Sequence, residues 1–266
     1  MCVNTNAVTH IKTSQEITSI IKEYYFFEKD YVFDQYNKST KQIMNSLDKY
    51  SEYYPPSLTD NTQVKDNYFS KKFFGLCYIK FTNFLEGTGT KFKNSLRDFK
   101  ESNCKTLILD LSFCDGGDLD CAINIAKQLV PKGKICEIEF KNETKTYYSE
   151  LDKCPFENII IITSPQTASA SEILISDLKE SNCAFIIGTN TYGKTAVQRS
   201  FELSNGGVLK LTVGKYYTRN GNDVEGVGVE PDINILHCLL ALISIVFVFV
   251  FLRIFYKRYS NRLNLN

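Results

Sequence analysis

The sequence predicts an α/β fold with a mixed sheet, a small helical arm before it and one transmembrane helix after it. Three observations carry this prediction. Short apolar runs alternate with segments of helical spacing between residues 73 and 188, two strand-like runs follow with a glycine turn between them, and a long uncharged apolar run stands near the end. Alternating strands and helices are typical of α/β domains, and a final hairpin adds antiparallel pairing. The expected division is 1–68 for the arm, 69–233 for the core, 234–253 for the membrane helix and 254–266 for a basic tail.

The arm is expected to contain two helices. Thr13 and Glu16 have the spacing of a capping box, and apolar residues at helical spacing continue to Tyr24. A second helical stretch covers about 38–48, and two prolines end it. A polar, loop-like segment then leads to the core.

The core elements follow from the spacing of the apolar residues. Buried strands alternate with helices whose apolar residues recur every three to four positions. After residue 194 two segments of period-two alternation turn at Asn205-Gly206-Gly207, which predicts a hairpin. The expected strands are 73–81, 106–111, 135–140, 158–163 and 184–188, and the expected helices lie near 92–99, 119–129 and 169–181.

Residues 235–252 read ILHCLLALISIVFVFVFL and contain no formal charge. Eighteen residues at a rise of about 1.5 Å span roughly 27 Å, which is close to the hydrocarbon thickness of a bilayer. We therefore expect a single-pass membrane protein that contacts the lipid bilayer through 235–252. The basic tail predicts a cytoplasmic C-terminus. Residues 1–30 contain no signal peptide to export the domain, which favours a domain facing the cytoplasm, so the topology signals disagree.

Composition excludes several classes of function. The chain carries 31 Lys+Arg against 30 Asp+Glu, so it lacks the basic excess of a nucleic-acid binder. Its two histidines, His10 and His237, are poorly placed for a histidine-based triad, and no Cys2His2 or HExxH metal site is present. The nine cysteines are odd in number and form no CxxC pair, which predicts free, buried thiols in a reducing compartment. We expect no metal and no cofactor.

A glycine loop offers one alternative function. The segment from Gly188 to Thr195 fits the phosphate-binding pattern GxxxxGK(S/T). That loop needs a helix directly after its lysine, because the helix N-terminus meets the phosphates. Here the residues after Lys194 alternate like a strand. A P-loop nucleotide-binding protein is kept only as a competing hypothesis.

A serine and a lysine could carry hydrolytic chemistry without histidine. Ser169 lies where a buried strand passes into a helix, although a serine there is commonly an ordinary helix cap. Gly116 and Gly117 end another buried strand and can present free N–H groups. Lys194 could act as general base if its pKa fell from about 10.4 towards 7, a change of about 4 kcal/mol.

Four motifs in order make the sequence resemble the carboxyl-terminal processing (tail-specific) proteases, which are serine–lysine endopeptidases with a ClpP/crotonase-like core. The motifs are LILDLSFCDGG (107–117), TASASEI (167–173), TYGKTAVQ (191–198) and LKLTVGKYYTRNG (209–221). The resemblance implies Ser169 as nucleophile, Lys194 as general base and Gln198 as the residue that orients the lysine. It also implies an oxyanion hole made by the N–H groups of Gly116 and Ala170, and a protein or peptide substrate.

Two departures of the sequence from that family bear most directly on its activity. A PDZ domain normally lies between the arm and the core, but too few residues separate Pro56 from Phe73 to hold one. The residues before the double glycine are Ser112 to Asp115, and an inward-facing Asp115 would weaken anion binding. These departures support a second hypothesis, a catalytically inactive membrane-bound relative that binds peptides. The oligomeric state is not readable from the sequence.

Overall fold

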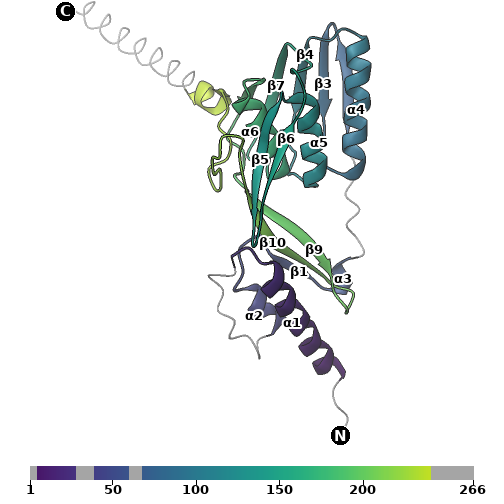
Figure 1. The fold of residues 1–266 in the computed structure, drawn as a ribbon, viewed down its shortest axis with the longest axis vertical. Coiled ribbons are helices and arrows are strands. Elements are labelled where there is room, and N and C mark those ends of the chain that lie inside the picture. Colours follow the sequence, from purple (N-terminus) through teal and green to yellow (C-terminus); the bar gives the residue numbers. More distant parts are fainter. Residues whose placement is uncertain (1–4, 28–38, 60–67, 241–266) are drawn as a thin grey trace, which may run out of the picture.

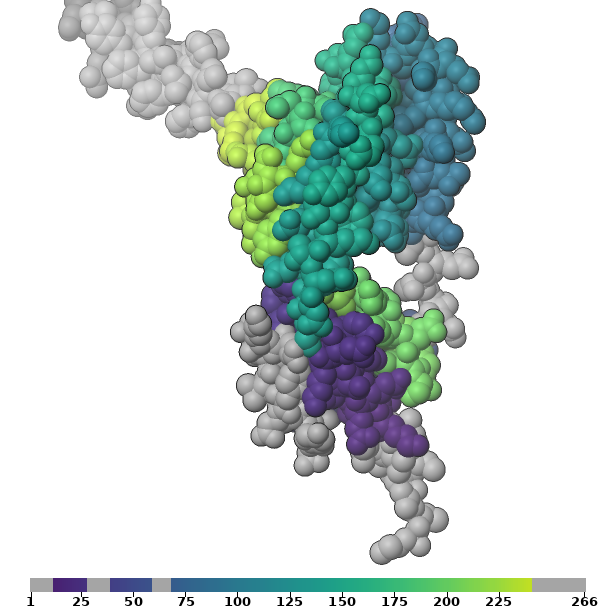
Figure 2. All heavy atoms as spheres, in the orientation of Figure 1, coloured from purple at the N-terminus to yellow at the C-terminus, as the bar shows by residue number. Residues whose placement is uncertain are grey.

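The computed structural model describes residues 5–27, 39–59 and 68–240, and it confirms a mixed α/β fold. A core domain with a six-stranded sheet lies above a smaller arm, and a long two-stranded ribbon, β9 and β10, connects the two (Figure 1). Figure 2 shows the arm, in purple, against the light-green ribbon below the core.

The core sheet has the order β11-β8-β7-β4-β3-β2, and all of its strands except β2 run parallel. Their carboxyl ends therefore meet at one edge, where Asp110 pairs with Ile162 and Thr163 pairs with Gly188. The three loops that leave this edge form the site described below. The strands are β2 (Phe69–Phe73), β3 (Leu76–Lys80), β4 (Thr106–Asp110), β7 (Asn158–Thr163), β8 (Ala184–Gly188) and β11 (Ile233–Asn234).

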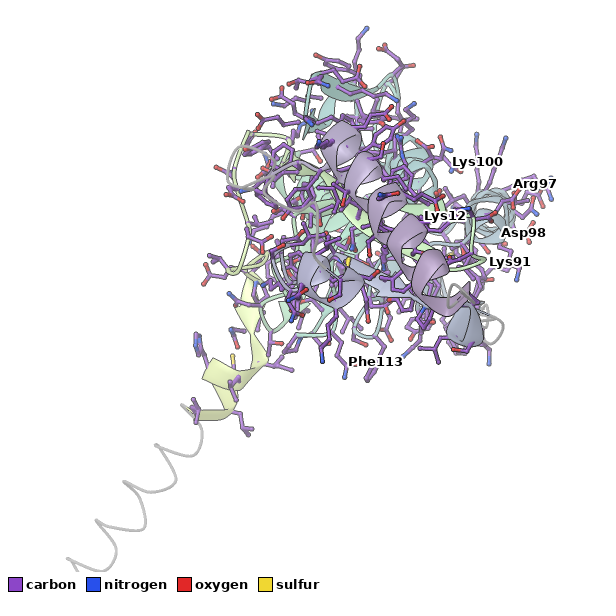
Figure 3. All side chains as sticks on the ribbon, turned by 90° about the horizontal axis from the view of Figure 1, so that it is seen from below. Lys12, Lys91, Arg97, Asp98, Lys100 and Phe113 are labelled. Carbon is purple, nitrogen blue, oxygen red and sulfur yellow. A yellow bond between two sulfur atoms is a disulfide. The ribbon has the colours of Figure 1, made fainter. Side chains whose placement is uncertain are left out.

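Three helices pack in the main hydrophobic core with this sheet: α4 (Glu86–Glu101), α5 (Leu119–Leu129) and α6 (Ala170–Glu180). Helix α4 is amphipathic, with Phe92 and Phe99 buried. Figure 3 shows Lys91, Arg97 and Lys100 of the same helix at the periphery of the molecule. Helix α6 is buried along most of its length because it lies in the centre of the domain, with the nucleophile candidate at its first turn.

The second sheet extends from the core to the arm. It consists of β1 (Glu52–Tyr54), β5 (Gly133–Phe140), β6 (Thr144–Ser149), β9 (Ala196–Glu202) and β10 (Val208–Tyr217). The end of β10 pairs with β5 of the core, and its beginning pairs with β1 of the arm. The predicted hairpin is confirmed, because β9 and β10 pair antiparallel.

The arm differs in detail from the expectation. Helix α1 (Thr5–Tyr24) begins upstream of Thr13, so the capping box predicted at Thr13 is wrong and that residue is buried inside the helix. The second helix is short, α2 (Thr40–Met44), and a further turn, α3 (Pro56–Thr59), follows β1. Apolar residues of α1 and α2 pack with Leu209, Leu211 and Val213 of β10 in a separate small core.

Two features of the core were not predicted. The expected strand at 73–81 is a hairpin, because Phe74 and Gly75 both have positive φ and turn β2 into β3. Cys77 and Cys104 form a disulfide with a Cα–Cα distance of 6.2 Å, so the expectation of thiols alone is wrong for this pair. The pairing escaped prediction because β3 and β4 bring together residues 27 positions apart.

The described part of the chain, up to residue 240, contains no helix that is long and apolar enough to cross a membrane. Strand β11 runs into a helical segment at 235–240, in which Ile235, Leu236, Leu239 and Leu240 are each about half exposed. Most of the predicted span at 235–252, and the tail after it, lie outside the described residues.

Candidate active site

Ser169 occupies a strained turn between β7 and α6. Its φ of 56° and ψ of −121° place a non-glycine residue in a region that L-amino acids rarely adopt. Such a conformation costs about 1–3 kcal/mol and persists only where the surroundings hold it. A serine on a sharp strand-to-helix turn is the geometry that exposes a nucleophile at the edge of a sheet.

The loop after β4 holds this turn from behind. The Cys114 carbonyl accepts hydrogen bonds from the N–H of Ala168 (3.1 Å) and from the hydroxyl of Ser171 (2.9 Å). Thr167 donates its hydroxyl to the carbonyl of Leu111 at 2.8 Å. These contacts fasten the two loops on either side of Ser169 to each other.

The double glycine packs directly against Ser169. Gly116 has a φ of 105°, and a Cβ atom there would lie 2.9 Å from the Cβ of Ser169 and 3.1 Å from the nitrogen of Ala170. Only glycine fits this approach. Ala170 and Gly117 line the cavity beside Ser169. The Gly116 N–H instead faces the buried thiol of Cys114. Burial raises the pKa of that thiol to about 11, and the Gly116 N–H opposes this rise.

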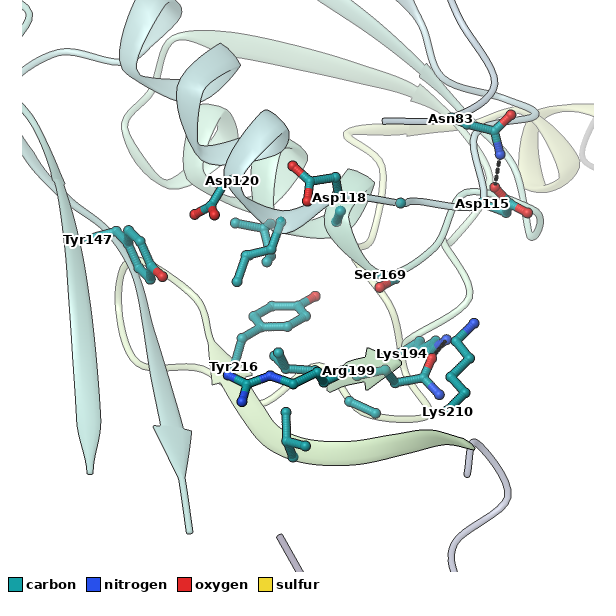
Figure 4. A pocket seen from close by; sticks show the side chains of 18 of the residues that line it. Asn83, Asp115, Asp118, Asp120, Tyr147, Ser169, Lys194, Arg199, Lys210 and Tyr216 are labelled. Atoms are coloured by element: carbon teal, nitrogen blue, oxygen red, sulfur yellow. Dashed lines mark hydrogen bonds between the residues drawn. The ribbon is translucent and has the colours of Figure 1, made fainter. Parts of the chain in front are cut away.

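The carboxylate of Asp115 also borders the cavity. It is exposed and accepts a hydrogen bond from Asn83 Nδ2 at 2.7 Å, which ties it to the loop after β3 (Figure 4). Its charge raises the pKa of Lys194, against the effect of burial.

Lys194 follows Gly193 in the loop just before β9 and is half-buried. Its ammonium group donates to Gln198 Oε1 at 2.6 Å and lies 5.0 Å from the ring centre of Tyr50. Burial lowers the pKa of Lys194, and the positive charge of Lys210 lowers it further. In the described residues no hydrogen bond joins Lys194 Nζ to Ser169 Oγ, but both side chains line one cavity of about 690 Å³.

Glu172 is a site residue that sequence analysis missed. It is fully buried and lies one turn into α6, where its Oε2 accepts the N–H groups of Ser169 (2.7 Å) and Lys194 (2.8 Å). Its Oε1 accepts the N–H of Gly193 (2.6 Å) and the hydroxyl of Thr191 (2.5 Å). Burial raises the pKa of Glu172, and these four hydrogen bonds oppose the rise. One carboxylate therefore fixes the backbone of both candidate catalytic residues.

The arm contributes a second unpredicted residue, Tyr50. Its carbonyl accepts the Nε2 amide of Gln198 at 2.5 Å, so the amide oxygen of Gln198 must face Lys194. The Tyr50 hydroxyl donates to Glu225 at 2.8 Å, and Glu225 in turn accepts the N–H of Thr195 at 2.9 Å. Gln198 is thus oriented by the arm, and the structure brings it together with Lys194 as the sequence led us to expect.

The P-loop hypothesis fails on the structure. The residues after Lys194 form strand β9, which begins at Ala196, so no helix N-terminus stands behind the glycine loop. The N–H groups of Gly193 and Lys194 are already bound to Glu172, whose negative charge would repel a phosphate.

Comparison with known proteins supports the resemblance seen in the sequence. The family model for peptidase family S41 matches residues 75–235. The carboxy-terminal processing protease CtpA of Bacillus subtilis is 31% identical over 180 residues, which cover 67% of this chain and 37% of that protein. The chloroplastic carboxyl-terminal-processing peptidase 2 of Arabidopsis thaliana is 34% identical over 158 residues, covering 58% of this chain and 31% of the relative. The match thus spans about a third of the length of these relatives.

Solved structures show the same likeness. The photosystem II D1 C-terminal processing protease superimposes with a TM-score of 0.53 at 28% identity, over 60% of this chain and 42% of that one. A lipoprotein from Streptococcus agalactiae shares the fold with a TM-score of 0.66 at 19% identity, over 85% of this chain and 91% of that one. The matched residues 75–235 include Ser169, Glu172, Lys194 and Gln198 but not Tyr50 of the arm, and the chain belongs to peptidase family S41.

Proposed function

We propose that the protein is a serine endopeptidase that uses Ser169 as nucleophile and Lys194 as general base. The observation that carries this proposal is the single cavity lined by a serine on a strained strand-to-helix turn and by a half-buried lysine whose pKa is lowered. Glu172 holds the backbone of both residues, which fixes their separation.

The reaction follows from the groups present. Neutral Lys194 takes the proton of Ser169 as Oγ attacks the scissile carbonyl, and the ammonium then gives that proton to the leaving amine. Water hydrolyses the acyl-enzyme by the same proton relay. Gln198 keeps the lysine amine directed at the cavity, because its own amide is bound to Tyr50.

The oxyanion of the tetrahedral intermediate would be held by the N–H groups of Ala170 and Gly116. Ala170 is the first residue of α6, so its N–H has no partner within the helix and lies at the positive end of the helix dipole. Gly116 must turn its N–H from the Cys114 thiol towards the cavity. A weak N–H···S contact is readily exchanged for a bond to an oxyanion, and glycine permits the rotation.

The test uses a fluorophosphonate probe and a peptide library with the full chain. We expect the wild-type protein to be labelled at Ser169 and to cleave peptides, whereas Ser169→Ala and Lys194→Met lose both activities. Equal cleavage by all three proteins would refute the mechanism. Peptide binding without labelling or turnover would support the alternative, a non-catalytic peptide-binding relative.

We also propose that residues 235–252 anchor the domain to a membrane. The apolar side chains exposed from Ile235 to Leu240 directly after β11 support this, since they continue the uncharged run of the sequence. The Cys77–Cys104 disulfide and the basic tail both favour a domain on the oxidising side of the membrane. The opposite, cytoplasmic orientation is the competing hypothesis, and protease protection of the domain in intact cells decides between the two.

A further inference from the structure

Tyr216 brings a buried hydroxyl group to the wall of the cavity beside Ser169. The side chain is 1% exposed and lines the cavity. Figure 4 shows its hydroxyl pointing towards the space between Ser169 and Asp118. Among the described residues none forms a hydrogen bond with Tyr216 Oη. Its backbone is fixed, because its N–H donates to the carbonyl of Thr195 at 3.0 Å.

A buried hydroxyl without a hydrogen-bond partner lowers the stability of the folded protein. Burial removes it from water, and no hydrogen bond within the protein compensates. Burial also raises the pKa of Tyr216, so the phenol stays protonated and can both donate and accept. The group is therefore set to form a hydrogen bond that a bound molecule supplies.

The surroundings restrict what can reach this hydroxyl. Ala170 and Ile173, on successive turns of α6, form one wall of the cavity, and Leu119 of α5 and Val213 of β10 add further apolar surface. Asp118 and Asp120 at the start of α5 line the same cavity, and so do Lys145 of β6 and Arg199 of β9. Because charges of both signs surround the cavity, neither an acidic nor a basic side chain is favoured by charge alone. A side chain that enters beside α6 meets apolar surface and the buried hydroxyl of Tyr216, with charged groups around them.

We propose that this part of the cavity binds the side chain of the substrate residue whose carbonyl Ser169 attacks, and that Tyr216 selects uncharged side chains with a hydrogen-bonding group, such as asparagine or serine. The proposal rests on the proposed function, since Ser169 defines which residue enters. The leaving amine must lie on the Lys194 side, where it receives its proton. Figure 4 shows Tyr216 and Lys194 approaching Ser169 from different sides, so the acyl-side residue is the one that meets Tyr216.

The experiment compares peptides that differ only at the acyl-side residue. Asparagine is matched with leucine, and serine with 2-aminobutyric acid, in otherwise identical sequences. Cleavage is measured for the wild-type protein and for Tyr216→Phe, which removes only the hydroxyl. Binding of the same peptides is measured by calorimetry with Ser169→Ala and with the double variant Ser169→Ala/Tyr216→Phe, so the result does not depend on turnover.

We expect the wild-type protein to favour the polar member of each pair in kcat/KM, and Tyr216→Phe to lower that preference by about tenfold. Ser169→Ala should show the same preference in Kd, and the double variant should lose it. An unchanged preference after removal of the hydroxyl overturns the proposal. Selective binding by Ser169→Ala without any cleavage by the wild-type protein would instead refute the proposed function and leave the selectivity of Tyr216 supported.

A folding control completes the test. Removal of an unpartnered buried hydroxyl should leave the urea midpoint of Tyr216→Phe equal to or above that of the wild-type protein. A clearly lower midpoint would show that the hydroxyl bonds within the protein, and this too would overturn the proposal.

Discussion

Glu172→Gln tests whether one buried carboxylate holds the two candidate catalytic loops together. The carboxylate accepts four hydrogen bonds at 2.5–2.8 Å, two on each oxygen. A glutamine has one oxygen, so in either orientation its NH₂ group faces two donors that were paired before. The Thr191 hydroxyl has little freedom to adapt, because it also accepts the N–H of Val229 at 2.7 Å.

The magnitude follows from those lost partners. Each buried donor left unsatisfied costs about 1–3 kcal/mol, so two of them cost about 4 kcal/mol. Glutamine carries no charge, which recovers part of the desolvation cost that raises the pKa of Glu172. We therefore expect a net loss of about 3 kcal/mol in the free energy of unfolding.

Urea unfolding of the full chain measures this loss, and fluorophosphonate labelling of Ser169 reports the geometry of the site. Glu101→Gln is the matched control, because Glu101 is exposed at the end of α4 and should change stability by less than about 0.5 kcal/mol. We expect labelling of Glu172→Gln to fall even in buffer, where most molecules remain folded. If Glu172→Gln were within 1 kcal/mol of the wild-type protein and labelled normally, the carboxylate would not be what joins the loops.

Three further predictions concern the base and the disulfide. The cleavage rate should rise with pH as Lys194 deprotonates, and the midpoint of this rise should lie below the ordinary pKa of lysine. Lys210→Met removes a like charge, so the midpoint should move upwards and kcat/KM at pH values below the midpoint should fall about three- to tenfold. Lys210→Arg keeps the charge and should change neither quantity. Gln198→Leu should reduce the plateau rate about tenfold or more, because the lysine amine loses the group that directs it. The midpoint of the pH profile should not rise, because the lost hydrogen bond stabilised the ammonium form, and a raised midpoint would contradict this. Cys77→Ser removes the disulfide between residues 27 positions apart and should lower the free energy of unfolding, measured in urea, by about 3.5 kcal/mol. A reducing agent should make the wild-type protein and the variant equally stable.

Local patterns in the sequence were sufficient to predict the main elements of the core. Strands β4, β7 and β8 each contain a run of three or four consecutive apolar residues, and helices α5 and α6 repeat their apolar residues at helical spacing. The parallel order of these strands places their carboxyl ends at one edge, so three loops far apart in the sequence had to meet there. The prediction that Ser169 and Lys194 share one site came instead from the resemblance to the tail-specific proteases.

The residues that hold the site were not predictable in the same way. The Ser169–Glu172 spacing is also that of an ordinary capping box, and nothing local indicates that Glu172 also reaches Gly193 and Lys194, more than twenty residues on. Tyr50 contacts Gln198 across 148 positions, and this contact depends on how β1 pairs with β10. Such contacts are properties of the tertiary fold, and only the fold reveals them.

The position of Tyr50 makes the arm part of the proposed chemistry. A lysine base works only if it is desolvated, and the arm supplies both the ring beside Lys194 and the carbonyl that orients Gln198. Asp48 and Ser51 anchor Tyr50 by hydrogen bonds to Thr212 of β10 at 2.9 and 3.1 Å, so displacement of the arm would rehydrate the lysine and release the glutamine together. Rehydration favours the charged ammonium, because burial is what lowers the pKa of Lys194. Release of Gln198 leaves the lysine amine without the hydrogen bond that directs it. The arm thus couples the folding of the β9–β10 ribbon to the protonation state of the base, a coupling that requires no additional domain.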